Sequence, residues 1–190
     1  MNRRDCLVGL AAGASLAATA TPAGDDTLLA EATALLRRTE EYWNAQDTAG
    51  LRTLWDTDDP EPFYLAGEQE DWFAGWPALN SYLAPAGQPK ITEAIRVRFY
   101  RIQARYLADD LAFAAYWMRT DMKLTFSRKP FGSDNRVSAV LRRIPDGWRY
   151  VTYAEAFQAP TGYLQKLFEK DVSPDYREFY EKSTGKKYPG

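Results

Sequence analysis

The chain has 190 residues, a formal net charge of −2, no histidine and a single cysteine, Cys6. The lack of histidine excludes Ser-His-Asp and Cys-His catalysis and makes a zinc or iron site unexpected, because histidine is the commonest ligand of these metals. Aromatic residues make up 14% of the chain, which predicts a large aromatic interior, and the charge balance gives no indication of nucleic-acid binding.

The first 23 residues have the pattern of an export signal. Arg3 and Arg4 precede an apolar run, 7–20, that is rich in Ala and Gly and ends in small residues suited to cleavage. This run is too short and too weakly apolar to span a bilayer. We expect residues 1–23 to be a twin-arginine signal peptide and the mature protein to be periplasmic or secreted, with no membrane association after cleavage. The alternative is an ordinary secretory signal that contains two arginines by chance.

Three helices and a short strand are expected before the main sheet. Helical spacing of apolar residues extends from a cap at Asp25 or Asp26 to Asn44. A short amphipathic helix follows the second cap, Asp47-Thr48. The acidic run 56–62 then predicts a loop. A short strand at 63–66 and a third helix at 76–83 complete this part.

Two long strands and a hairpin are expected next, at 92–107, 111–126, 136–143 and 148–157. The first of them changes the phase of its apolar alternation, which predicts a β-bulge near Phe99 and Tyr100. The second is apolar on both faces, as is typical of a central strand. The hairpin turns at Pro145-Asp146-Gly147. Further helices are expected after Pro160.

This order of elements resembles the nuclear transport factor 2-like superfamily, also called SnoaL-like or polyketide-cyclase-like. The motifs that carry the resemblance are Trp43-Asn44-x-x-Asp47, Leu51-x-x-Leu54-Trp55, Gly75-Trp76-x-Ala78-Leu79-x-x-Tyr82 and the strands around Asp146-Gly147-Trp148. The resemblance covers roughly residues 28–157. It implies an α+β fold in which a cone-shaped, strongly bent, mixed or antiparallel sheet wraps round the N-terminal helices and encloses a pocket. Residues 24–159 would form this domain, and residues 160–190 an extra helical extension that covers the sheet or serves as a dimer arm.

The resemblance also implies a range of functions, because many unrelated activities share the fold. Its catalytic members typically use an inward carboxylate with tyrosine or another donor, often without a cofactor. We therefore expect a cofactor-independent lyase or isomerase that acts on a small apolar, aromatic or polycyclic molecule. The alternative is a non-catalytic ligand-binding or assembly module, and the sequence leaves open whether the protein is an enzyme. This chain departs from relatives that use histidine, such as scytalone dehydratase and the carboxylate-histidine cyclases, so their mechanisms cannot transfer to it.

Glu155 is the candidate proton carrier. If Ile144 pairs with Trp148 in the hairpin, one face carries Val137, Ala139, Leu141, Val151, Tyr153 and Glu155. The other face then carries Ser138, Val140, Arg142, Tyr150 and Thr152. The first face is more apolar and should be concave, where burial would raise the pKa of Glu155 toward that of a useful base. The alternative is a strand-end glutamate paired with Arg136 or Arg98.

The other candidate residues are aromatic or cationic. Tyr64 and Tyr106 are the predicted catalytic donors to a developing oxyanion. The predicted substrate-binding residues are Tyr42, Trp55, Trp72, Trp76, Arg98, Tyr116, Arg119 and Tyr153. For the tyrosines and tryptophans the alternative is an ordinary place in the core. For the two arginines it is a structural ion pair or a place on the convex face.

No metal site is expected. The acidic runs 56–61 and 68–71 are the only oxygen-rich clusters. Calcium is conceivable there, but neither run matches a known calcium loop, and solvated charges and helix caps are the favoured interpretation.

A homodimer is expected from the outer faces of the hairpin and of the second long strand, which are apolar. Relatives commonly pair such sheets across a two-fold axis. The alternative is a monomer in which the C-terminal helices cover the sheet.

Overall fold

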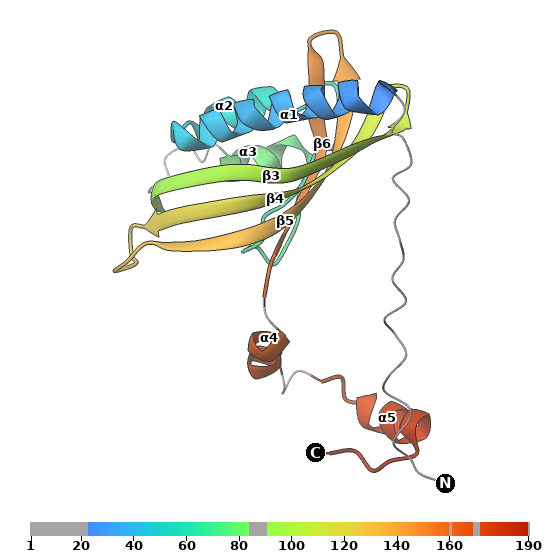
Figure 1. Cartoon of the computed structure of the whole chain (residues 1–190). Coiled ribbons are helices and arrows are strands. Elements are labelled where there is room, and N and C mark those ends of the chain that lie inside the picture. The colour runs from blue at the N-terminus through green and yellow to red at the C-terminus, as the bar shows by residue number, and fades with distance from the viewer. Residues whose placement is uncertain (1–22, 84–90, 160, 169–171, 190) are drawn as a thin grey trace.

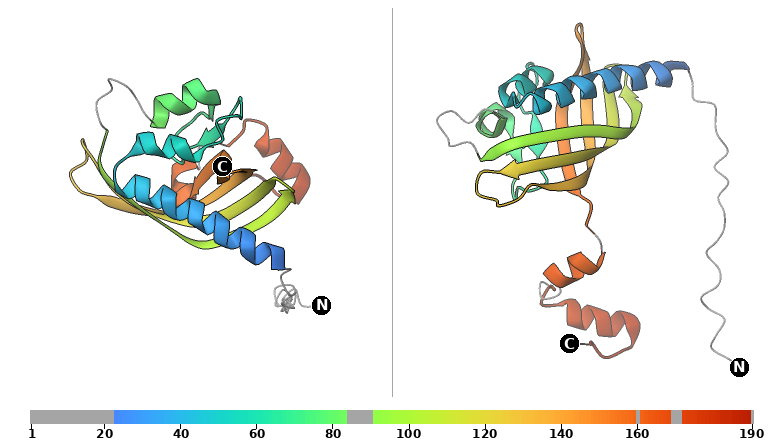
Figure 2. Two further views of the ribbon diagram at one scale, coloured as in Figure 1. Left: turned by 90° about the horizontal axis from the view of Figure 1, so that it is seen from above. Right: turned by 60° about the vertical axis from the view of Figure 1, so that its left-hand side comes forward.

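The computed structural model describes residues 23–83, 91–159, 161–168 and 172–189, so the expected signal peptide lies outside the described residues, apart from Ala23. The long helix α1 (Ala23–Asn44) runs across the inner face of a strongly bent sheet (Figure 1). A short helix α2 (Thr48–Leu51), a 3₁₀ turn η1 (Arg52–Leu54) and helix α3 (Gly75–Leu83) close the same side (Figure 2). This arrangement confirms the expected α+β cone.

Six strands form the sheet, in the order β2-β1-β6-β5-β4-β3. They are β1 (Phe63–Leu65), β2 (Phe73–Ala74), β3 (Thr92–Ala108), β4 (Leu111–Leu124), β5 (Phe131–Ile144) and β6 (Gly147–Phe157). Strand β1 lies parallel to β6 and all other neighbours are antiparallel. The mixed sheet agrees with expectation, whereas strand β2 was not expected and β5 begins five residues earlier than the sequence pattern predicts.

Alternation along β4 and β5 defines the inner face of the cone. Every second residue of β4 from Ala112 to Thr120 is buried, and Val137, Ala139 and Leu141 of β5 are buried beside them. Leu28, Leu35 and Leu36 of α1 pack onto this face and complete the core. The helix is amphipathic because its apolar residues recur at helical spacing and only one stripe meets the sheet.

The expected bulge in the first long strand is present. The pairing of β3 with β4 shifts between Tyr100 and Gln103, and Arg101 has a left-handed backbone with φ of 53°. The extra residue restores the inward phase after the break, so that Ile102 and Ala104 also face the core.

The register of the hairpin differs from expectation at its turn end. Ala139 pairs with Tyr153 and Val140 with Thr152, as predicted, but Leu141 pairs with Tyr150. A bulge at this point shifts the remaining pairs by one residue. As a result Tyr150 points into the cone and is 2% exposed, whereas the sequence analysis placed it on the outer face.

Side chains at and just after the end of α1 form hydrogen bonds with the backbone of the edge strand β3. The side-chain amide of Asn44 donates to the carbonyl of Val97 (3.2 Å) and accepts from its N–H (2.8 Å). Gln46 does the same to Ile95, at 2.6 and 2.9 Å. Two side chains thus satisfy backbone groups that a neighbouring strand would otherwise pair.

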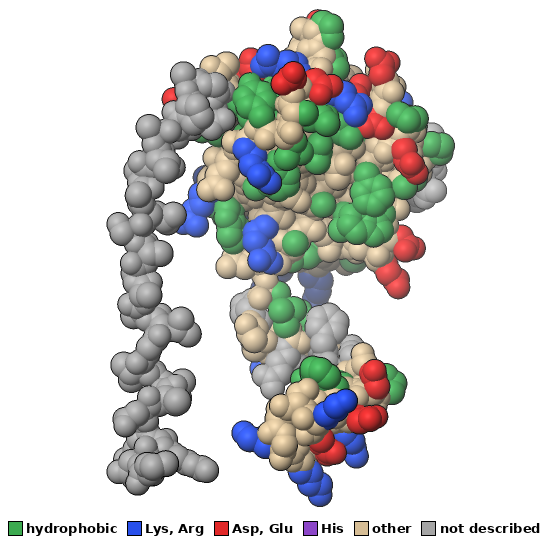
Figure 3. Space-filling model, turned by 90° about the vertical axis from the view of Figure 1, so that its right-hand side faces the viewer, with side chains coloured by type: hydrophobic (Ala, Val, Ile, Leu, Met, Phe, Trp, Pro, Cys, Tyr) green, Lys and Arg blue, Asp and Glu red, His purple; other side chains and the backbone are tan. Residues whose placement is uncertain are grey.

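The C-terminal helices α4 (Thr161–Phe168) and α5 (Tyr176–Thr184) stand clear of the cone (Figures 1 and 3). Several of their large apolar side chains are exposed: Tyr163, Leu164, Leu167, Tyr176 and Phe179. These helices therefore do not cover the sheet in this structure, and their role as a dimer arm stays a prediction. Among the described residues, no helix is both long and apolar enough to cross a membrane.

Candidate active site

Three neighbouring strands bring Glu155, Tyr64 and Asn135 together inside the cone. Glu155 lies on β6 opposite Val137, and Asn135 is two residues away on the same face of β5. Tyr64 arrives from β1, where it pairs with Tyr153. The Tyr64 hydroxyl donates to Oε1 of Glu155 (3.2 Å), and Asn135 Nδ2 donates to Oε2 (3.1 Å). Both carboxylate oxygens are therefore held in a fixed direction.

The surroundings of Glu155 shift its ionisation toward neutral pH. Burial among aromatic rings raises the pKa of Glu155 to about 7, and the nearby charge of Glu68 acts in the same direction. The hydrogen bonds from Tyr64 and Asn135, together with the nearby hydroxyl of Tyr153, oppose this shift without cancelling it. A carboxyl group with such a pKa takes up and releases a proton near neutrality, which suits a general base or acid. Burial also raises the pKa of Tyr64, so its hydroxyl stays a neutral donor.

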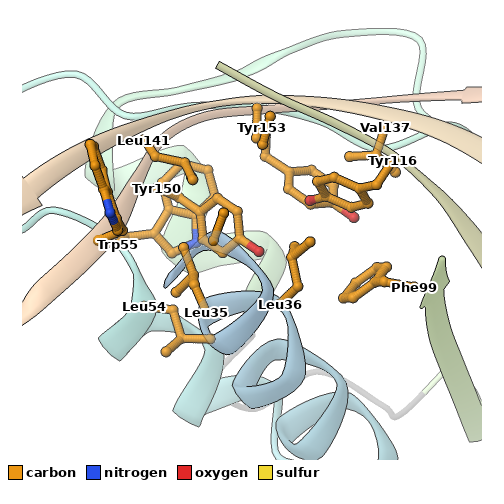
Figure 4. Packing of buried hydrophobic residues seen from close by; sticks show 14 of the residues in the cluster. Leu35, Leu36, Leu54, Trp55, Phe99, Tyr116, Val137, Leu141, Tyr150 and Tyr153 are labelled. Atoms are coloured by element: carbon orange, nitrogen blue, oxygen red, sulfur yellow. The ribbon is translucent and has the colours of Figure 1, made fainter. Parts of the chain in front are cut away.

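The interior next to this carboxylate is rich in aromatic rings, and Figure 4 shows Trp55, Tyr116, Tyr150 and Tyr153 among them. Tyr64 and Tyr153 stack with centroids 5.0 Å apart and planes 8° from parallel. Trp55 lies against Tyr64 at 6.1 Å and against Tyr150 at 5.6 Å. Tyr116, from the inner face of β4, is 3% exposed, and its buried hydroxyl has no hydrogen-bond partner. The site is thus apolar in its walls and carries a few polar groups.

The interior cavity beside these rings is small. It measures about 20 Å³, room for about one water molecule. Its lining residues are Thr39, Trp43, Leu51, Trp55, Tyr64, Leu83, Tyr150 and Tyr153. The expected pocket is therefore largely filled by aromatic side chains, and a ring-sized ligand requires some of them to move.

A larger hollow of about 350 Å³ lies outside the cone, between α1 and the β5–β6 turn. It contains the ion pair of Glu31 with Arg143, and Trp148 Nε1 donates to the same carboxylate (2.8 Å). The partners of these charges are already present, and the shifted carboxylate of Glu155 is not among the lining residues. We therefore place the candidate site in the interior, on its chemistry rather than on its size.

Tyr106 is not brought to Glu155. It lies near the end of β3, 38% exposed, with its ring 6.2 Å from that of Trp148. Its partner on β4 is Ala112, four residues along the strand from Tyr116, which corresponds to about 13 Å. The structure therefore separates Tyr106 from the carboxylate with which the sequence analysis grouped it.

The two candidate arginines lie on the outer face. Arg98 and Arg119 are directly opposite each other in the β3–β4 pair, and Arg98 is exposed. Arg119 forms ion pairs with Asp121 (3.0 Å) and Asp134 (3.3 Å). Their positions correspond to the alternative interpretation, a convex-face arginine and a structural ion pair.

Three of the predicted aromatic substrate-binding residues lie elsewhere in the fold and not beside Glu155. Tyr42 lies between α1 and α2, where its hydroxyl is 3.5 Å from Thr53 Oγ1. Trp72 is 52% exposed and packs against Phe63, with ring centroids 4.6 Å apart and planes tilted by 34°. Trp76 Nε1 donates to the carbonyl of Asp59 (2.8 Å) and so ties α3 to the acidic loop. The predicted residues that do meet in the interior are Glu155, Tyr64, Trp55, Tyr116 and Tyr153.

Sequence reasoning missed Asn135 and Tyr150. The predicted strand began at residue 136 and left out Asn135, yet Asn135 shares the inward phase of Val137 and Ala139, a signal that extending the strand by one residue would have used. Tyr150 was assigned outward because no residue of the hairpin signals the bulge. Its hydroxyl lies 2.9 Å from that of Thr39, which in turn bonds the carbonyl of Leu35.

The acidic loop after η1 is a structural element. Asp56 is 2% exposed and pairs with Arg142 (2.7 Å), which also lies 3.6 Å from Asp59. Asp56 and Asp59 also cap backbone N–H groups of the loop. In the part of the chain that the structure describes, no group of three or more acidic, histidine or cysteine side chains is placed to hold a metal ion.

No protein-family model matches the chain, and no curated protein is similar to it in sequence. Its structure is similar to solved ones. A nuclear transport factor 2-like superfamily protein from Salmonella enterica has 18% identity and a TM-score of 0.59, over 72% of this chain and 95% of that one. A candidate scytalone dehydratase from Novosphingobium aromaticivorans has 8% identity and a TM-score of 0.60, over 70% and 85%. A type-3 hexachlorocyclohexane dehydrochlorinase from Novosphingobium barchaimii has 8% identity and a TM-score of 0.57, over 70% and 88%. At these identities the likeness is one of fold.

Proposed function

The chain has the nuclear transport factor 2-like fold, and we propose that its interior binds a small organic molecule on which Glu155 moves a proton. The reaction class is that of a lyase or isomerase that uses no cofactor. The observation that carries the proposal is the Glu155 carboxylate, which is held by two donors among aromatic rings and has a pKa of about 7.

The geometry suggests a division of roles. Glu155 breaks a C–H bond by taking the proton on one carboxylate oxygen, and the electron pair moves toward an oxygen or a leaving group of the substrate. Because the Tyr64 hydroxyl already donates to Glu155, it orients the base. The Tyr116 hydroxyl has no partner, so it is free to donate to the developing negative charge. Return of the proton to another atom completes an isomerisation, and departure of the leaving group completes an elimination.

Two similar structures support the elimination. One is named a scytalone dehydratase and the other a hexachlorocyclohexane dehydrochlorinase. The names denote loss of water and of hydrogen chloride, which both begin or end with a proton transfer of the kind proposed for Glu155. The support is by analogy of fold, since the chain shares only 8% identity with each.

The test begins with a thermal-shift screen of aromatic acids, sterols and polyketide-like compounds, followed by mass spectrometry of the bound or released species. With a substrate in hand, Glu155→Gln should lower turnover by about 10²-fold or more. Glu70→Gln is the matched control, because Glu70 is an exposed carboxylate that does not contribute to the pKa shift of Glu155, and this change should leave turnover nearly unchanged. Equal turnover of wild type and Glu155→Gln would remove Glu155 from this role.

A second candidate function is a non-catalytic binding module. The small size of the interior cavity favours it, because a closed aromatic core can serve a carrier or an assembly domain without any reaction. The same screen separates the two functions: recovery of an unchanged ligand supports the binding module, and accumulation of a product supports the enzyme.

We also propose export by the twin-arginine route, from the Arg3-Arg4 pair and the apolar run that follows it. A fusion of residues 1–24 to a folded reporter should reach the periplasm, and the double change Arg3→Lys, Arg4→Lys should block it. A reporter that is still exported after the double change points to the general secretory route.

A further inference from the structure

Unpaired polar atoms gather on one wall of the cone. In the described part of the chain, five buried side-chain N or O atoms lack a hydrogen-bond partner, and four of them lie on the inner face of β4 and β5. These four atoms are Tyr116 Oη, Thr120 Oγ1, Ser133 Oγ and Asn135 Oδ1. Thr120 pairs directly with Ser133, and Asn135 pairs with Met118, between Tyr116 and Thr120. The register places Thr120, Ser133 and Asn135 next to one another and Tyr116 further along the same inner wall, about 13 Å from Thr120 along the strand, and Asn135 connects this polar patch to Glu155.

This clustering is unusual for a protein interior. A buried hydroxyl or amide oxygen without a partner destabilises a fold, and most such groups in native proteins are paired. Tyr150, on the inner face of the neighbouring strand β6, follows that rule, because its hydroxyl meets that of Thr39 at 2.9 Å. The patch beside Glu155 does not, so the fold retains several uncompensated polar groups where the chemistry is proposed.

We propose that this patch is a polar subsite that receives the hydroxylated end of the ligand. The inference rests on the proposed function and narrows its substrate class. Asn135 Nδ2 donates to Glu155, which fixes the amide with Oδ1 turned away as an acceptor. An acceptor requires a donor on the ligand, and the hydroxyls of Tyr116, Thr120 and Ser133 either donate or accept. The ligand is therefore a small alcohol or phenol rather than a purely apolar molecule, with its apolar body against the aromatic rings.

The first test needs no substrate and compares two substitutions of the same kind. Tyr116→Phe and Tyr150→Phe each remove one hydroxyl from a tyrosine that is 3% or 2% exposed. The hydroxyl of Tyr150 meets that of Thr39 at 2.9 Å, whereas the hydroxyl of Tyr116 lies near that of Tyr150 without a hydrogen bond of normal geometry. Tyr116→Phe should raise the Tm by about 2–4 °C, and Tyr150→Phe should lower it by a similar amount. Thr120→Val should behave like Tyr116→Phe. A fall in Tm for both Tyr116→Phe and Thr120→Val overturns the proposal, since their hydroxyls are then already paired in the free protein.

The second test uses phenol and toluene as probes, which have nearly the same size and differ in one hydroxyl. NMR titration of the ¹⁵N-labelled side-chain amide of Asn135 should show phenol binding at least about tenfold more tightly than toluene. The double variant Tyr116→Phe, Thr120→Val should lose this preference. Equal binding of the two probes, or binding of neither, overturns the subsite.

The two proposals fail separately. If Glu155→Gln abolishes turnover while phenol and toluene bind alike, only the subsite is wrong. If the preference for phenol holds while Glu155→Gln keeps full turnover, the subsite stands and the role of Glu155 is wrong.

Discussion

Glu155 shows how position gives an ordinary side chain an unusual pH range. Its carboxyl group has a reference pKa of 4.5, and the aromatic surroundings raise it to about 7. The charged carboxylate accepts two hydrogen bonds, which stabilise the ionised form, whereas burial destabilises it. The two effects together leave both forms available near neutral pH.

The pH dependence of stability follows from this shift. Between about pH 4.5 and 7 the unfolded chain has lost the Glu155 proton while the folded chain keeps it, so the free energy of unfolding falls as the pH rises through this window. The full effect is on the order of 3 kcal/mol, from about 1.4 kcal/mol per pKa unit. Glu155→Gln should therefore stabilise the protein more at pH 8 than at pH 5. Urea unfolding at both pH values measures this, with the exposed Glu70→Gln as control. An equal gain at the two pH values contradicts the raised pKa.

Removal of the ion pair between Asp56 and Arg142 should cause a large loss of stability. The Asp56 side chain is 3% exposed, so Arg142→Leu leaves a buried carboxylate without its cation. The expected cost is about 3 kcal/mol in the free energy of unfolding. Arg143→Leu is the matched control, because its partner Glu31 has a side chain that is 40% exposed, and about 1 kcal/mol or less is expected. Denaturant unfolding compares the two, and similar costs would show that burial of Asp56 does not matter.

The inner or outer position of single residues was predictable only where the strand register is regular. The inward position of Glu155 follows from alternation, because it pairs with Val137 in the unshifted part of the hairpin. Tyr150 was placed on the wrong face because the bulge lies between it and that part. Arg119 lies in β4, whose two faces are both rich in apolar residues, so the pattern does not say which face is inner. Arg98 alternates with Val97 and Phe99 in β3, and this alternation does predict its outward position.

At the scale of elements, long periodic segments were predictable and short ones were not. Helix α1 and strands β3 and β6 follow clear periods of 3.6 or 2 residues, and β4 is a long run that is apolar on both faces, as is typical of a central strand. Strand β2 has two residues and exists only because Phe63 and Tyr64 pair with it, a contact that no local pattern contains. The bulge in β3 was visible because it changes the phase of a long alternation.

The hydrogen bonds between the end of α1 and the edge of β3 should contribute measurably to stability. Asn44→Ala or Gln46→Ala removes two hydrogen bonds to the backbone of β3 and leaves its N–H and C=O groups without a protein partner. Each change should lower the free energy of unfolding by about 1–2 kcal/mol. Gln103→Ala, an exposed glutamine of the same strand, should change it by less than about 0.5 kcal/mol. Urea unfolding measures all three, and a loss for Gln103→Ala equal to the other two would contradict the argument.

The whole molecule was predictable as a fold but not as an assembly. The order and spacing of elements indicated the cone, since a bent sheet and a long amphipathic helix have few ways to bury each other's apolar faces. The sequence left open whether the C-terminal helices cover the sheet or extend from it as a dimer arm. In the structure, α4 and α5 lie apart from the sheet.

We propose that the outer face of the sheet forms the interface of a homodimer. Tyr150 and Trp148 turn inward, so this face depends on half-buried Phe113, Trp117 and Val140. Light scattering on the mature protein should give twice the monomer mass, and Val140→Asp should give the monomer. Phe179→Asp on α5 should leave the dimer intact if the sheet is the interface and should disrupt it if the C-terminal arm is. A wild-type monomer at high micromolar concentration removes the dimer altogether.

The side chains that bond the edge of β3 also affect whether the protein aggregates through its sheet edges at high concentration. A sheet with free edges invites a second chain to add as a further strand and to continue into a polymer. Here one edge strand, β2, is two residues long. At the other edge, side chains already accept from three N–H groups of β3: Gln46 from Ile95, Asn44 from Val97 and the carboxylate of Glu40 from Phe99. Asn44→Ala combined with Gln46→Ala should therefore form ordered aggregates under conditions where an equally destabilised core variant only unfolds.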